Sequence, residues 1–381
     1  MGRNTGKILI AAAVLGVAFV AGCAAKNDYE LIATSSETTV ETTEETVPDE
    51  FKPAYYYMPL GAVEVEGRQG VCANEDYYWV SSSRSLAKYD KDWNLLTINH
   101  DPFKDLRIPD PADLAAAESS TSGSTSAETS SESTSAETSS ESTSAGNTQS
   151  GNTQAGNATV SPSATPTPAI EYNHIGDLDV YDNELYICAE CFRDGVGANI
   201  TLAVFDTDTL ELKRKLNFQR SSGQLECSGI AVDPDTKTIW TCSWADNESS
   251  KYLYKYNLET GEYAGKVLMM NAPKWIQGIT YYNGALYLTS DDGDAEYNEP
   301  DHLFRVEINP GATECEVTPE RTFVDVVRQG EIEGVTFDRS KGQLLLLYNR
   351  GCRFVNGVHE GYYEGYDHEI KEIYVFMVSA A

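Results

Sequence analysis

The sequence predicts an all-β protein of the β-propeller class, and two observations lead to that prediction. A phrase made of a glycine and a short alternating strand occurs five times, each time followed by a polar turn and an apolar strand. The glycines of the last four copies are 53, 49 and 56 residues apart. Repeats of this length indicate four-stranded units repeated radially, which is the arrangement of a propeller. The five glycines are Gly70, Gly176, Gly229, Gly278 and Gly334.

Each unit is expected to contain two further strands. In the third unit, segments 252–256 and 263–268 alternate apolar and polar side chains, which indicates strands, and no long segment shows a period of 3.6 residues. The fourth strand of the fourth unit is expected at 322–326. We count five four-stranded blades. A sixth blade, within 55–65 or in the long last unit, remains an alternative.

The two ends of the repeat region predict how the ring closes. The last unit stops after its third strand at 373–376, whereas a spare strand at 61–66 precedes the first unit. If the spare strand completes the last blade, the ring loses an exposed sheet edge, which would otherwise invite aggregation. The N-terminal strand is therefore expected to pair with the last blade.

Residues 1–22 have the features of a signal peptide: basic Arg3 and Lys7, then an apolar run too short for a span of roughly 20 residues. The ending Val20-Ala21-Gly22-Cys23 resembles the lipobox of bacterial lipoproteins. That resemblance implies cleavage before Cys23, lipidation of its thiol by palmitate-like chains, and an extracytoplasmic protein anchored to the cell membrane. The alternative is an ordinary secretory signal in which the cysteine has no role.

Two segments have the composition of disordered chain. Residues 23–50 are rich in Thr and Glu and form an expected stalk, and residues 115–169 are rich in Ser and Thr and form an expected insertion. The segment before the insertion is too small to bury a core alone, and surface loops tolerate long insertions. We therefore predict one propeller domain over 51–381 that the insertion interrupts.

Charge and cysteine content limit the partners. A formal net charge of −31 repels phosphate backbones, so a nucleic-acid partner is not expected. The chain has eight cysteines and no dense disulfide pattern. One or two bridges, a Cys227–Cys242 pair among them, a zinc site, and free thiols all remain open.

Residues that lead into the first strand of a blade, or leave the second, are expected to surround the mouth of the central channel. Such positions hold mainly carboxylates, carboxamides and one imidazole, chemistry that suits Ca²⁺ or Mg²⁺. The alternative is a polar rim that satisfies strand-end backbone groups and binds nothing. The predicted ligand-binding residues are His174, Asp177, Glu190, Glu226, Trp244, Gln277, Glu331, Asn349 and Arg350.

The phrases at 228–235, 277–281 and 333–338 resemble the strand openings of regucalcin/gluconolactonase-like and NHL-repeat propellers. The likeness covers 170–381 well and 55–100 loosely. It implies a divalent metal, such as calcium, bound by a glutamate just before the first-strand glycine. Glu333 occupies that position, and Asn349 and Asp291 correspond loosely to the partner ligands. These families include lactonases, phosphotriesterases and binding proteins, so the likeness does not decide the activity.

The first functional prediction is a membrane-anchored binding module for a glycan, a peptide or a small molecule. The alternative is a metal-dependent hydrolase of the lactonase or phosphotriesterase kind. In that case His174 would accept a proton from metal-bound water, and Arg350 would stabilise the developing negative charge. A glutaminyl-cyclase-like transferase is a third possibility for which the sequence has no matching motif. Whether the protein is an enzyme stays open.

Overall fold

The computed structural model describes residues 52–106, 172–218, 222–297, 299–326, 329–355 and 358–381. The predicted signal peptide, Cys23, the stalk and the insertion at 115–169 lie outside these residues. Pro48–Ala381 form one compact unit. No helix in the described ranges is long and apolar enough to cross a bilayer.

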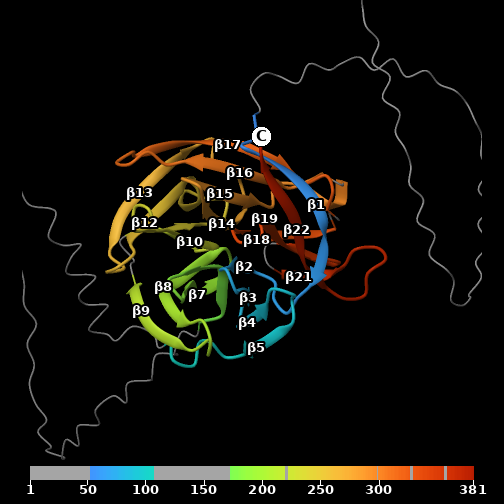
Figure 1. Cartoon of the computed structure of the whole chain (residues 1–381), viewed down its shortest axis with the longest axis horizontal. Coiled ribbons are helices and arrows are strands. Elements are labelled where there is room, and N and C mark those ends of the chain that lie inside the picture. The colour runs from blue at the N-terminus through green and yellow to red at the C-terminus, as the bar shows by residue number, and fades with distance from the viewer. Residues whose placement is uncertain (1–51, 107–171, 219–221, 298, 327–328, 356–357) are drawn as a thin grey trace, which may run out of the picture. The chain divides into compact units, whose positions relative to one another are not determined.

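The described strands form five four-stranded antiparallel arrays around a common centre (Figure 1). Array 1 contains β2 (Gly70–Ala73), β3 (Tyr77–Ser82), β4 (Ser85–Asp90) and β5 (Leu95–Asn99). Array 2 contains β6 (His174–Tyr181), β7 (Glu184–Arg193), β8 (Val196–Asp206) and β9 (Leu212–Phe218). Array 3 contains β10 (Gly229–Asp233), β11 (Thr238–Cys242), β12 (Tyr252–Asn257) and β13 (Tyr263–Met270). Array 4 contains β14 (Ile276–Tyr282), β15 (Ala285–Ser290), β16 (His302–Glu307) and β17 (Glu314–Thr322).

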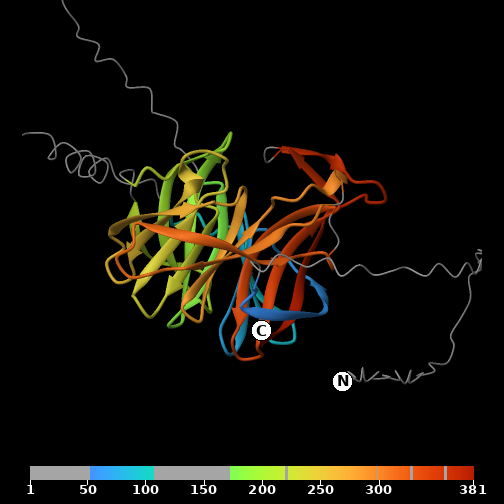
Figure 2. The same cartoon turned by 90° about the horizontal axis from the view of Figure 1, so that it is seen from above.

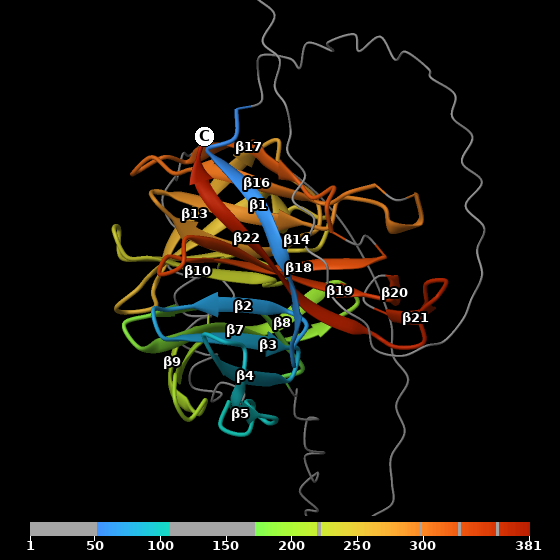
Figure 3. The same ribbon diagram turned by 45° about the vertical axis from the view of Figure 1, so that its right-hand side comes forward.

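Array 5 shows how the ring closes. It contains β18 (Gly330–Asp338), β19 (Gln343–Arg350), β22 (Ile370–Ala380) and β1 (Tyr55–Glu64). Strand β1 runs antiparallel along β22, with Ala62 opposite Tyr374 and Val63 opposite Ile373 (Figure 3). The predicted all-β propeller class is confirmed, and so is its closure by the N-terminal strand.

Two segments differ from the sequence prediction. The fourth strand of array 4 is Glu314–Thr322, not 322–326. Its first residues pair in parallel with β13, so arrays 3 and 4 share a continuous sheet. A long-range parallel pairing leaves no local pattern, which explains the error. The segment between β19 and β22 contains an additional hairpin, β20 (Cys352–Val355) with β21 (Val358–Tyr362). This hairpin projects away from the arrays (Figure 2).

The hydrophobic core is divided among the interfaces between neighbouring arrays. Five clusters of buried side chains each join two adjacent arrays, and together they connect all five arrays in a ring. Trp79 of array 1, for example, packs in one cluster with Ile175 and Leu185 of array 2. Strand alternation supplies these contacts, because every second side chain points to the same neighbouring array.

One carboxylate ties the inner strands together at the axis. Asp177 is fully buried, and its Oδ1 accepts the backbone N–H groups of Val71, at 3.1 Å, and Leu178, at 2.9 Å. Its Oδ2 accepts those of Ile279, at 3.2 Å, and Val335, at 3.3 Å. A single side chain therefore satisfies donors from the inner strands of arrays 1, 2, 4 and 5.

The repeated glycine is explained by how closely these strands approach. A Cβ atom at Gly70 would lie 2.4 Å from the Cα of Asp177, and one at Gly334 would lie 2.4 Å from the Cα of Gly70. No side chain fits at such separations. The glycine of the repeated motif is thus required by close packing of the inner strands at the axis. Backbone atoms and the Asp177 side chain fill the axis at this point.

Candidate functional site

A pocket of about 130 Å³ opens beside the inner-strand ends that precede the glycines. Its floor is polar and its walls are partly aromatic. This volume is smaller than the roughly 300 to 1,000 Å³ of pockets that enclose drug-sized ligands, so it suits one small group. The lining residues are Arg68, Gln69, Ser83, His174, Phe192, Glu226, Trp244, Gln277, Glu331, Glu333 and Phe354.

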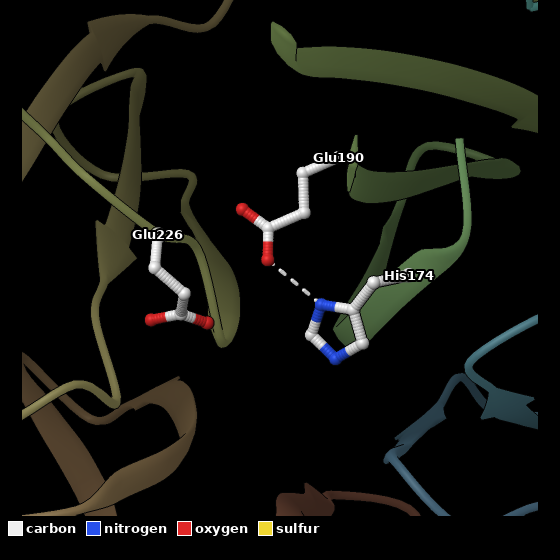
Figure 4. Close-up of side chains that lie close together, drawn as sticks. All are labelled: His174, Glu190 and Glu226. Atoms are coloured by element: carbon white, nitrogen blue, oxygen red, sulfur yellow. Dashed lines mark hydrogen bonds and ion pairs between the residues drawn. The ribbon is translucent and has the colours of Figure 1, made fainter. Parts of the chain in front are cut away.

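On one side of the pocket, an imidazole and two carboxylates meet. His174 belongs to β6, Glu190 to β7, and Glu226 precedes β10. The His174 Nδ1 lies 2.8 Å from Glu190 Oε1, and Glu226 approaches the pair from array 3 (Figure 4). One potential ligand atom from each residue can be chosen so that all three lie within 4.8 Å of one another. We call these three residues the acid–imidazole cluster.

Hydrogen bonds around Gln69 fix the tautomer of His174. The Gln69 Nε2 donates to the Arg68 carbonyl, at 3.1 Å, and to both oxygens of Glu333, at 3.2 Å. Its Oε1 must therefore face the other way, where it lies 2.6 Å from His174 Nε2. Since a carboxamide oxygen only accepts, Nε2 carries the hydrogen. The lone pair of a neutral His174 consequently sits on Nδ1 and points to Glu190.

Local structure holds the two glutamates in place. Glu190 Oε2 accepts the backbone N–H of Cys227 at 3.0 Å, and Glu226 Oε2 accepts that of Trp244. A disulfide joins Cys188, two residues before Glu190 on the same strand, to Cys227, which follows Glu226. Both glutamates are thus fixed beside a covalent link between arrays 2 and 3.

The disulfide corrects the sequence prediction. Cys227 pairs with Cys188, and Cys242 is a free, buried thiol. Cys242, which lies on β11, was one of the alternatives that the sequence left open as a partner for Cys227. The actual partner comes from the neighbouring array, which sequence spacing could not show.

Glycine at position 197 makes room for the cluster. A Cβ atom there would lie 1.9 Å from Glu190 Oε2 and 3.0 Å from the Cα of Glu226. The N–H of Gly197 also donates to the carbonyl of Leu225, just before Glu226. The strand β8 therefore both clears the space for Glu190 and anchors the segment that carries Glu226.

Burial shifts the protonation equilibria of the cluster. It raises the pKa of Glu190 to about 8, and burial together with the charge of Glu190 raises the pKa of Glu226 well above its ordinary value. Burial lowers the pKa of His174, although the charge of Glu226 opposes that shift. These directions agree with the tautomer, since a protonated Glu190 donates to the Nδ1 lone pair.

On the other side of the pocket, Glu333 is surrounded by donors. Besides Gln69, the Asn349 Nδ2 donates to Glu333 Oε1 at 2.8 Å. The same Nδ2 donates to the Arg68 carbonyl at 2.8 Å, which fixes the orientation of the amide. Burial raises the pKa of Glu333 well above its ordinary value, and the Arg68 charge opposes that shift. We call Glu333, Gln69, Asn349 and Arg68 the amide-bonded side of the pocket.

This side does not fit the expected calcium site. Calcium needs converging oxygen atoms, yet Asn349 presents its NH₂ group to Glu333, and its Oδ1 is buried with no partner among the described residues. The third expected ligand, Asp291, accepts the backbone N–H of Ile332. Glu333 and Asn349 are in contact as the resemblance implied, but as acceptor and donor.

Aromatic side chains form the wall next to the acid–imidazole cluster. The Phe192 ring centroid lies 5.3 Å from that of His174 and 6.2 Å from that of Trp244. Trp275 continues the row at 4.8 Å from Trp244. The Trp244 Nε1 is buried and has no partner within the described ranges. The wall thus consists of aromatic rings inclined to one another, at 76° between Phe192 and Trp244 and 47° between Trp244 and Trp275.

The remaining predicted residues divide between the pocket and other parts of the fold. Gln277 and Glu331 line the pocket, and Glu331 lies 3.4 Å from the guanidinium of Arg68. Asp177 is the axial carboxylate and does not line the pocket, because four backbone donors hold it. Arg350 is not a lining residue either: it bonds both oxygens of Glu372, at 2.7 and 3.0 Å.

The lining residues outside the predicted set include Phe192, Arg68 and Phe354. Phe192 lies two positions beyond Glu190 on β7 and so shares its face, a signal that strand alternation could have given. Arg68 comes just before Gln69-Gly70, so aligning the repeats could have placed it among the residues that lead into a first strand. Phe354 belongs to the hairpin β20–β21, and no repeat pattern could have placed it.

No family model matches the chain, and no curated protein matches it. Among solved structures, it is similar to hydrazine synthase of Kuenenia stuttgartiensis, with 9% identity and a TM-score of 0.36 over 76% of this chain and 58% of that chain. It is also similar to a chain of a nidogen/laminin complex, with 16% identity and a TM-score of 0.32 over 45% of this chain and 56% of that one. It therefore spans little more than half of either chain. Both scores are below 0.5, so the propeller class rests on the strand pairing described above.

Proposed function

We propose that this protein is a membrane-anchored binding module on the extracytoplasmic side of the cell, and that its ligand is the end of a neutral glycan. One observation carries the proposal: a pocket with room for one small group combines an aromatic wall with a floor of hydrogen-bonding side chains. Glu226, Glu331 and Gln277 can accept hydrogen bonds from sugar hydroxyls. Trp244 and Phe192 offer the flat, amphipathic surface against which a sugar ring can pack.

Charge and size argue against other ligand classes. The net charge of −31 opposes the binding of anions. A pocket of about 130 Å³ cannot enclose a folded peptide or a large cofactor. A terminal monosaccharide unit matches both limits.

The binding test uses purified protein and three neutral monosaccharides: glucose, galactose and N-acetylglucosamine. Titration calorimetry should detect binding of at least one of them, and Trp244→Ala should weaken it at least tenfold. Tyr297→Ala is the matched control, because Tyr297 is 79% exposed and lies outside the pocket. Equal affinity in Trp244→Ala and wild type, or no binding of any of the three sugars, would refute the proposal.

The membrane anchor is tested separately. Cys23 follows a signal-like segment, and two acyl chains on one residue suffice for stable anchoring. Wild-type protein expressed in a bacterial host should fractionate with the membrane, whereas Cys23→Ala should not. Membrane association that survives this substitution would refute lipid anchoring.

The alternative, a metal-dependent hydrolase of the lactonase or phosphotriesterase kind, has one observation in its favour. His174 and Glu226 line the pocket and Glu190 is buried next to them, so a potential base and two carboxylates lie within 4.8 Å of one another. Arg350, expected to stabilise negative charge, is paired with Glu372 and leaves that role unfilled. Hydrolysis of δ-gluconolactone or a phosphotriester that is lost in His174→Gln would favour this alternative over the binding module.

A further inference from the structure

We propose that His174, Glu190 and Glu226 bind one divalent transition-metal ion, with zinc preferred. This site differs from the one that the family resemblance implied at Glu333, Asn349 and Asp291. The ion would lie at the pocket for which we propose sugar binding. Only the role of the ion rests on that proposed function, because metal binding can be measured without a sugar.

The first argument is the number and type of ligands. One imidazole nitrogen and two carboxylate oxygens form a three-ligand set with a further position open, as in catalytic or ligand-binding zinc sites. The ligand atoms lie within 4.8 Å of one another, and zinc bonds of about 2.0–2.2 Å require separations of about 3.3 Å. His174 Nδ1 and Glu190 Oε1 are 2.8 Å apart, so binding of the ion would separate these two atoms slightly and draw Glu226 toward them. Calcium, which prefers oxygen ligands only, fits the imidazole poorly.

The second argument is the orientation of the histidine, which is independent of the acidic groups. Metal-bound histidines usually donate their other ring N–H to a fixed acceptor, which orients the ring and its tautomer. Here Gln69 Oε1 is that acceptor, 2.6 Å from Nε2, and two acceptors fix Gln69 in turn. The Nδ1 lone pair is therefore aimed at the cluster by a hydrogen-bond chain that does not involve Glu190 or Glu226.

The third argument is the shortage of positive charge and donors. The contact between His174 Nδ1 and Glu190 Oε1, at 2.8 Å, needs one hydrogen, because both atoms otherwise carry lone pairs. A metal ion replaces that hydrogen and joins both atoms. Glu226 is 1% exposed and, within the described part of the chain, has no cationic side chain bonded to it, only the backbone N–H groups of Trp244 and Ala245, and the same ion would balance its charge.

The backbone around the cluster leaves space for the carboxylates and restricts their movement. Gly197 leaves the room that Glu190 occupies, and the Cys188–Cys227 disulfide fixes the strands on which both glutamates depend. The fourth position of the ion would face the pocket that Trp244 and Phe192 line. There it could bind a hydroxyl oxygen of the proposed sugar.

The test is a calorimetric titration of the metal-free protein with ZnCl₂ alone. Metal analysis after dialysis then measures how much zinc stays bound. We expect one zinc per chain. Affinity should fall at least 100-fold in Glu226→Gln and in His174→Gln. Glu320→Gln is the matched control: Glu320 is also buried, but it binds Tyr57 and the backbone of Ala54 and Tyr55 away from the pocket. It should bind zinc within threefold of wild type.

Circular dichroism in EDTA checks that each variant folds. Should both cluster variants misfold, Gly197→Ala provides a second route, because the added methyl displaces Glu190 and should weaken zinc binding at least tenfold. Cobalt as a replacement ion supplies a spectroscopic readout, since visible absorption reports nitrogen and oxygen ligation. Wild-type affinity in Glu226→Gln, loss of affinity in Glu320→Gln alone, or tighter binding of calcium than zinc would overturn the site.

Failure of the zinc site can be distinguished from failure of the proposed sugar binding. Zinc binding without any sugar binding supports the metal site and refutes the glycan ligand. Sugar binding in EDTA, in a protein that takes up no zinc, refutes the metal site and leaves the binding module intact.

Discussion

The two sides of the pocket contain similar side chains in different hydrogen-bonding states. On the amide-bonded side, Glu333 accepts N–H groups from Gln69 and Asn349 and lies near the Arg68 charge. In the acid–imidazole cluster, Glu190 accepts the backbone N–H of Cys227 and lies against His174. Glu226 accepts the backbone N–H groups of Trp244 and Ala245 and lies beside the other two residues. One side supplies its carboxylate with side-chain amide donors, whereas the contact between His174 and Glu190 on the other side needs an added hydrogen or an ion.

The difference shows that acidic content alone does not identify a cation site. Glu333 has two side-chain amide donors and a guanidinium charge nearby, so it is satisfied within the protein and gains little from an ion. A carboxylate opposite a lone pair lacks a hydrogen or an ion, since unpaired buried charge is costly. The accounting of donors and acceptors, residue by residue, therefore selects the cluster over the site that the resemblance favoured.

The largest expected effect comes from removing the disulfide beside the cluster. The bridge closes a separation of 39 residues, and loop entropy assigns such a bridge about 4 kcal/mol. The double variant Cys188→Ala/Cys227→Ala should lose about that much free energy of unfolding in urea, and its zinc affinity should fall about tenfold. Cys191→Ala, a free cysteine on the same strand, is the control and should change stability by less than about 1 kcal/mol. A double variant as stable as wild type would contradict the bridge.

The second effect is a pH dependence specific to the cluster. Burial raises the pKa of Glu190 to about 8 from an ordinary 4.5, so the native state holds a proton that the unfolded chain releases. The associated stability is fully present below about pH 4.5 and is lost progressively as the pH rises to about 8. Between pH 5 and 8 in EDTA, wild type should lose about 3 kcal/mol more than Glu190→Gln does.

The control for this pH series is Glu184→Gln. Glu184 lies at the start of the same strand, but hydrogen bonds from Arg214 lower its pKa to about 2, which is outside the range tested. Its pH profile should follow that of wild type. Identical profiles for Glu190→Gln and wild type would show that Glu190 is not the protonated member of the cluster.

The fold was accessible from sequence because its physical cause repeats. Each inner strand needs a glycine where it packs closely against its neighbours, so the same requirement recurs five times along the chain. The closing strand could be predicted because the last unit lacks a fourth strand and an extra strand precedes the first unit. The pairing of β13 with β17 could not, since it joins strands about 50 residues apart with no shared motif.

The site was only partly accessible for the same reason. Strand ends placed His174, Glu190 and Glu226 on one face, but the sequence does not encode which hydrogen bonds they make. The direction of the Asn349 amide and the pairing of Cys188 with Cys227 depend on neighbours from other arrays. The repeats predicted where these side chains lie. Their hydrogen bonds and protonation depend on neighbouring residues from other arrays, which the repeats do not reveal.

The smallest effect, and the most direct test of the comparison, is Glu333→Gln. The Gln69 and Asn349 donors would lose a charged acceptor, and a buried NH₂ group would face them, so the free energy of unfolding should fall by about 2 kcal/mol. Zinc affinity should stay within threefold of wild type, because Glu333 is held by amides and is not a ligand. Urea unfolding and zinc titration on the same preparation measure both quantities. A large loss of zinc affinity without loss of stability would mean that both sides act as one charged cavity, and that local donor counting does not locate the ion.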